Sequence, residues 1–160
     1  MKTVGYNWWA STALTIMCLY WLSNVVLWMP WRYNPQLGMG MMLTVNPIFW
    51  GVGLYSCLAC EGGARSLVKK AMWVSLIAVG ISLISDFLFF AMYMGSKEVW
   101  HITTFYGYAW LVVLTFAEAL LLRKRLMAKR QVATKKRLLI LASCLLLLWI
   151  LQILFVCNFK

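Results

Sequence analysis

Two acidic side chains inside long apolar runs are the residues of this chain best placed to do chemistry. The sequence holds four acidic residues, Glu61, Asp86, Glu98 and Glu118, and only Asp86 and Glu118 lie within such runs. A carboxylate near the centre of a bilayer costs about 2.5–3.5 kcal/mol on insertion scales, so it should face protein or water. We therefore expect Asp86 to bind a proton, an ion or a polar group. Glu118, about one turn from a basic segment, could instead pair with a nearby cation.

Polar residues continue from Asp86 along one side of its apolar run. At about 100° per residue, Ser75, Ser82, Asp86 and Tyr93 fall within roughly 40° of one another on a helix. The next apolar run carries a second, broader polar face, with Thr104, Tyr108, Thr115 and Glu118. The two faces predict a polar seam between helices that carries a proton, an ion or a polar solute group. The alternative is a packing stripe, because hydroxyl groups also stabilise helix contacts in lipid.

Further polar residues lie near the outer ends of the predicted helices, about one turn closer to the outer surface than Asp86. Asn24 and Asn46 are about five residues from these ends, and Pro47 frees a backbone carbonyl that a cavity could use. If these faces converge, they form an outer-facing polar cleft centred on Asp86, with Arg32 and His101 near its mouth. The candidate binding residues are Asp86, Asn24, Asn46, Tyr108, Ser82, Thr115, Arg32 and Glu118. The alternative is that these residues simply reach the membrane surface.

Residues suited to metal or redox chemistry are few. Cys57 and Cys60 share a helix face, and six of the ten methionines gather near the predicted outer edge. Thiolates and thioethers suit Cu(I), but Cys and Met are also ordinary packing residues. His101 is the single histidine, which excludes a histidine cluster, and no phosphate-binding Gly loop or dinucleotide fingerprint occurs. The sequence indicates no catalytic residue and no particular cofactor.

The composition shows which elements must position these residues. Apolar residues make up 64% of the chain and charged residues 12%, whereas an average soluble domain has roughly half and a quarter. A chain of this size cannot bury that excess, so the excess must face lipid. Runs long enough to span a bilayer occur at 8–29, 41–60, 71–95, 103–122 and 138–157. We predict one all-α domain over residues 1–160, a polytopic bundle of five transmembrane helices.

The basic residues that give the net charge of +11 lie mostly between these runs. With the N-terminus inside, the cytoplasmic segments hold twelve Lys and Arg residues and the outer segments three. This split predicts N-terminus in and C-terminus out, in the cell inner (cytoplasmic) membrane. These residues should bind anionic lipid head groups, whereas nucleic acid is not an expected partner. Pro30, Pro35 and Gly38 predict a turn between the first two helices.

A weak internal repeat links the first two helix hairpins. Residues 22–24 (Leu-Ser-Asn) recur as residues 84–86 (Ile-Ser-Asp), and Trp50 recurs as Trp110. Parallel repeats about an axis along the membrane normal would bring Asn24 to Asp86, with the amide donating to the carboxylate. The fifth helix would then lie outside a four-helix core. The alternative is that any two apolar hairpins with basic ends match this well.

Three classes of function fit these features. The first is a small membrane protein that binds or passes a small solute, ion or lipid group through a cleft centred on Asp86. The second is an accessory or assembly subunit of a larger membrane complex, in which Asp86 pairs with a partner helix; a homo-oligomer is also open. The third is a membrane-embedded enzyme, which the scarcity of catalytic residues disfavours.

Overall fold

The part of the chain that the structure describes is mostly helical, with short non-helical connections. The computed structural model describes residues 2–64, 66–95, 102–128 and 131–159. The elements are α1 (Lys2–Tyr33), α2 (Pro35–Ala59), α3 (Leu67–Ser85), η1 (Asp86–Tyr93), α4 (Ile102–Leu121), α5 (Arg123–Ala128) and α6 (Lys135–Phe159). Among these described residues, five segments are long and apolar enough to cross a membrane: Asn7–Leu27, Pro35–Ala59, Leu67–Tyr93, Thr104–Leu121 and Lys135–Cys157. The predicted all-α bundle of five transmembrane helices is confirmed.

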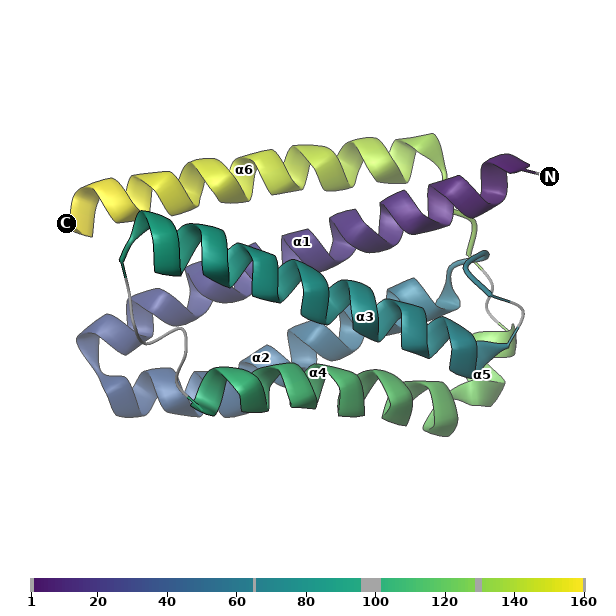
Figure 1. The fold of residues 1–160 in the computed structure, drawn as a ribbon, viewed down its shortest axis with the longest axis horizontal. Helices are drawn as coiled ribbons and strands as arrows, with labels where there is room; N and C mark the ends of the chain where they lie inside the picture. Colours follow the sequence, from purple (N-terminus) through teal and green to yellow (C-terminus); the bar gives the residue numbers. More distant parts are fainter. Residues whose placement is uncertain (1, 65, 96–101, 129–130, 160) are drawn as a thin grey trace.

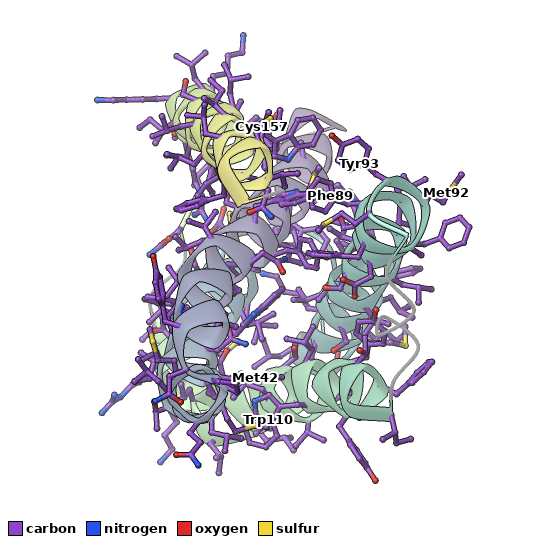
Figure 2. The ribbon with its side chains drawn as sticks, turned by 90° about the vertical axis from the view of Figure 1, so that its left-hand side faces the viewer. Met42, Phe89, Met92, Tyr93, Trp110 and Cys157 are labelled. Atoms are coloured by element: carbon purple, nitrogen blue, oxygen red, sulfur yellow. The ribbon has the colours of Figure 1, made fainter. Side chains whose placement is uncertain are left out.

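Four of the spanning helices form a ring, and the fifth lies outside it. α1 and α4 each pack against both α2 and α3, so the order around the ring is α1–α2–α4–α3. α6 packs along α1 on the outside, as predicted, and the two chain termini lie at opposite ends of the bundle (Figure 1). We call the end that holds α5 and the α2–α3 loop the basic end, and the end where α1 meets α2 the turn end. Figure 2 looks into the ring from the turn end and shows side chains projecting between the helices.

The order of helices in the ring differs from that of the predicted repeat. A two-fold axis along the membrane normal would place α1 and α3 at opposite corners of a four-helix ring. Instead α1 and α3 are neighbours, and α4 lies diagonally across from α1. The prediction of a two-fold repeat is therefore wrong.

The turn between α1 and α2 contains fewer residues than predicted. α1 continues through Pro30, and α2 already begins at Pro35, so Asn34 alone separates the two helices. Proline suits the first position of a helix because its missing N–H would have no partner there. The Asn34 side chain accepts hydrogen bonds from two backbone amides of the first turn of α2, at 2.9 and 3.3 Å. Gly38, expected in the turn, is a buried residue of α2.

The third spanning segment changes helix type at Asp86. From this residue the chain forms the π-helix η1, in which N–H groups bond five residues back, as Met94 N does to Phe89 O at 3.0 Å. The wider turn rotates later residues away from the α-helical stripe. Tyr93, predicted to end the polar stripe, is therefore 61% exposed and stacks on Phe89. π-Helical segments in proteins are often found at functional sites.

Candidate functional site

Asp86 is the point at which three helices of the ring are joined by hydrogen bonds. Tyr20 of α1, only 5% exposed, donates its hydroxyl to Oδ1 of Asp86 at 2.5 Å. Tyr108 of α4 donates its hydroxyl to the other carboxylate oxygen, Oδ2. Asp86 itself begins η1 and is half-buried. The carboxylate thus faces the ring and not lipid.

The carboxylate of Asp86 has acceptor capacity beyond its two tyrosine hydrogen bonds. Among the residues that the structure describes, no basic side chain lies close enough to Asp86 to balance the charge of its carboxylate. A carboxylate has about four lone-pair sites, so two tyrosine hydroxyls leave about two of them available. In a medium of low dielectric constant, both a hydrogen bond and the attraction to a cation are stronger than in water. The site can therefore hold a proton or a small cation.

Tyr20 is a partner of Asp86 that is not among the candidate binding residues predicted from the sequence. A tyrosine in an apolar run usually packs against its neighbours or lies at the membrane surface. Its place one helical turn before Asn24 puts both residues on the same face of α1. This spacing could have indicated Tyr20 as a partner of Asp86. Its side chain is longer than that of Asn24 and starts one turn deeper, so its hydroxyl reaches the carboxylate that the Asn24 amide does not reach.

The two asparagines of the predicted cleft do not bond to Asp86 directly. Nδ2 of Asn24 donates to the backbone oxygen of Tyr20, at 3.0 Å, in its own helix. The expected bond from the Asn24 amide to Asp86 is therefore corrected: the Tyr20 hydroxyl takes that place. Asn46 is half-buried in α2, and its Oδ1 atom is buried with no hydrogen-bond partner among the described residues.

Three seam residues of α3 and α4 are buried, and the hydroxyl groups of the two serines among them lack protein partners in the described chain. Ser75 and Ser82 are 4% and 3% exposed, and both Oγ atoms are buried with no partner in the described chain. Thr115 is fully buried and donates its hydroxyl to the backbone oxygen of Leu111, at 2.7 Å. Buried polar atoms without a protein partner call for an explanation, and an ordered water is the usual one.

Among the described residues, Glu118 does not form the ion pair considered from the sequence. No described basic side chain pairs with it, and its buried Oε2 atom has no partner among the described residues. The carboxylate faces α2, where Oε1 lies 3.2 Å from the position that a Cβ atom would take at Gly51. The basic residues of α5 are exposed instead, because α5 lies beyond the end of the ring.

Two residues of the predicted cleft mouth fall outside what the structure describes. Arg32 belongs to α1, but its side chain is among those not described, and His101 lies wholly outside the described residues. Their placement near the mouth of a cleft stays a prediction.

A separate pocket lies at the basic end, far from Asp86. It has a volume of about 570 Å³ and is lined by the α2–α3 loop, the start of α3 and α5. Lys70, only 7% exposed, lines it, donates to the backbone oxygen of Cys60 and lies over the ring of Trp8. Burial raises the pKa of the Cys60 thiol above its usual value, although Arg137 and Lys70 oppose that shift. The neutral thiol is a poor metal ligand.

The structure adds no support for a metal centre. Within the described residues, no group of three or more His, Cys, Asp or Glu side chains is placed to hold a metal ion. Cys57 and Cys60 are both free thiols, buried at the basic end.

Comparison with known proteins gives no independent indication of the function of this site. No protein-family model, no curated protein and no solved structure matches the chain. The function must therefore be argued from the residues themselves.

Proposed function

We propose that this multi-pass membrane protein binds a small cation at Asp86 and passes it through the interior of the four-helix ring. The proposal rests on one observation: a carboxylate at membrane depth is held by two tyrosine hydroxyls from different helices, with no basic partner among the described residues. Acidic groups inside membrane spans are rare, and they mark ion pathways and proton relays. Hydroxyl and carboxylate oxygens are also the ligands that hard cations prefer.

The proposed site is self-contained within one chain. Tyr20 and Tyr108 supply the hydrogen bonds that a partner helix would otherwise have to provide to Asp86. This favours a binding protein over an accessory subunit whose Asp86 pairs with another chain. The charge distribution supports the rest of the proposal: a cell inner-membrane location, the N-terminus and the basic end in the cytoplasm, and contact of the basic loops with anionic lipid head groups.

Cation binding should appear as stabilisation of the folded protein. In nanodiscs, replacing N-methylglucamine chloride with NaCl at constant ionic strength should raise the unfolding temperature of the native protein. A ligand at one hundred times its Kd stabilises by about 2.7 kcal/mol. Asp86→Asn should lose the shift, because the neutral amide gives no charge to the cation.

Glu61→Gln is the matched control, since Glu61 is a carboxylate in the α2–α3 loop, outside the ring. It should keep the full shift. Equal shifts in the native protein and in Asp86→Asn would contradict the proposal. Obligate co-purification with other subunits, together with no shift, would favour the accessory-subunit hypothesis instead.

A further inference from the structure

The pocket at the basic end is lined by both polar and apolar groups. Its polar lining comes from the α2–α3 loop and from the side chains of Glu61 and Lys70. Its apolar side chains come from three helices and belong to Leu58, Leu67, Leu126 and Met127. The volume of about 570 Å³ falls within the range of pockets that hold small ligands, about 300–1,000 Å³. The lining therefore suits an amphiphilic ligand, with one polar and one apolar part.

The pocket lies at the level where the apolar spans end. The second span ends at Ala59 and the third begins at Leu67, and both residues line the pocket. Met127 also lines it and is 54% exposed, so the pocket reaches the surface of the bundle. In a bilayer the lipid head groups occupy this level, and the acyl chains occupy the adjoining hydrocarbon region. A membrane lipid is therefore an amphiphile with direct access to the pocket.

Two opposite charges line the pocket. Lys70 is 7% exposed, and its ammonium group donates to the backbone oxygen of Cys60 and lies 5.6 Å from the centre of the Trp8 ring. These contacts hold a positive charge at the pocket wall. Glu61 is half-buried, and its carboxylate forms no hydrogen bond or ion pair with another described residue. A purely anionic ligand would place a second negative charge beside Glu61, whereas a zwitterion complements both charges.

Hydrogen bonds from other segments hold the polar lining in place. The backbone N–H of Glu61 donates to the oxygen of Gln131 at 2.6 Å, and the N–H of Gln131 donates to the oxygen of Ala59 at 3.0 Å. The Arg137 guanidinium donates to Oε1 of Gln131 at 3.2 Å and to Oγ of Ser56 at 2.8 Å. The α2–α3 loop is thus tied to the connection between α5 and α6. A lining fixed in this way loses little conformational freedom when a ligand binds.

We propose that the basic-end pocket binds the head group of a phospholipid that carries a primary amine, of the phosphatidylethanolamine type. The phosphate group lies beside the Lys70 ammonium, and the amine, protonated at neutral pH, donates to the Glu61 carboxylate. The apolar side chains contact the glycerol and the first carbons of the acyl chains. This site is separate from the cation site at Asp86 and does not depend on it.

Native mass spectrometry of the detergent-solubilised protein tests the proposal, by titration with three lipids that share the same acyl chains. Phosphatidylethanolamine should bind about tenfold more tightly than phosphatidylcholine or phosphatidylglycerol. The choline group has no N–H to donate to Glu61, and the glycerol head group has no positive charge. Free phosphoethanolamine, which has the same polar groups without acyl chains, should bind at least about tenfold more weakly than the lipid, because it buries less apolar surface.

Two variants with a single changed charge separate the pocket from the overall charge of the basic end. Glu61→Gln should bind the three lipids with similar affinities, because the neutral amide does not attract the amine. In lipid-free detergent it should unfold at the temperature of the native protein, since its carboxylate has no described partner to lose. Lys69→Gln is the matched control, because Lys69 is exposed and does not line the pocket. It should keep the native preference for phosphatidylethanolamine.

The lipid titration and the sodium-dependent unfolding temperature report on different sites. Asp86→Asn, which should lose the sodium shift, should keep the lipid preference of the native protein. Equal affinities of the native protein for the three lipids would overturn the pocket assignment, as would a preference that survives in Glu61→Gln. Tighter binding of phosphatidylglycerol would contradict the role of Glu61 and show that positive charge alone attracts phosphate. Free phosphoethanolamine that binds as tightly as the lipid would contradict a membrane source of the ligand.

Discussion

Asp86→Leu should destabilise the protein by about 2–6 kcal/mol, because it leaves two tyrosine hydroxyls inside the ring without an acceptor. Each buried donor that loses its acceptor costs about 1–3 kcal/mol, and the leucine side chain offers none. Asp86→Asn should cost less, since its amide oxygen still accepts one of the two hydrogen bonds. The change is measured by unfolding the reconstituted protein with a graded denaturing detergent.

A triple variant shows that the loss comes from the hydroxyl groups. Replacing Tyr20 and Tyr108 with phenylalanine in the Asp86→Leu background removes the stranded donors and should recover much of the lost stability. If Asp86→Leu is as stable as the native protein, the three-helix contact is absent in the membrane. If the triple variant recovers nothing, the destabilisation has another source, such as poor packing of leucine.

Trp8→Ala should be the most damaging change at the basic end, at about 3–5 kcal/mol. Trp8 is fully buried, and its Nε1 atom donates to the backbone oxygen of Cys57 at 3.2 Å. Its ring lies beneath the loop that leads into α3, where a Cβ atom at Gly63 would come within 2.6 Å of it. The same ring faces the Lys70 ammonium, 5.6 Å from the ring centre. One side chain thus ties α1 to the end of α2 and to the α2–α3 loop.

The adjacent tryptophan is a matched control for Trp8. Trp9 is 38% exposed and contacts Trp73 at the surface of the bundle, with ring centres 5.3 Å apart. Trp9→Ala should therefore cost much less than Trp8→Ala in the same unfolding measurement. Equal losses for the two variants would show that the basic end is not packed around Trp8.

The number of spans and the inward orientation of Asp86 could be predicted because both follow from the cost of polar groups in lipid. Length and hydropathy alone define the five helices, and a lone carboxylate must find partners inside the bundle. The identity of those partners could not be predicted. Tyr20 and Tyr108 reach Asp86 only because α1 and α4 both flank α3, and that order depends on packing between apolar faces that look alike in sequence.

Local backbone structure explains the remaining differences. The change to a π-helix at Asp86 rotates Tyr93 out of the polar stripe. No residue type in that apolar segment predicts the change of helix type. Pro30 predicts a turn after the first helix, yet α1 continues through it to Tyr33. Asn34 and Pro35 then form a tight junction with α2. The sequence allows an ion pair between Glu118 and basic residues close to it in the chain, but the basic residues of α5 lie beyond the end of the ring.

Reaction of Asp86 with a membrane-soluble carbodiimide tests the central claim, cation binding at this carboxylate, most directly. Carbodiimides modify the protonated carboxyl group, so a cation that displaces the proton protects the residue. We predict that mass spectrometry of the native protein will find the modification on the peptide containing Asp86, and that increasing sodium at constant ionic strength will reduce it. Modification of Asp86 that sodium does not change, or none at Asp86 at any sodium concentration, would contradict the account.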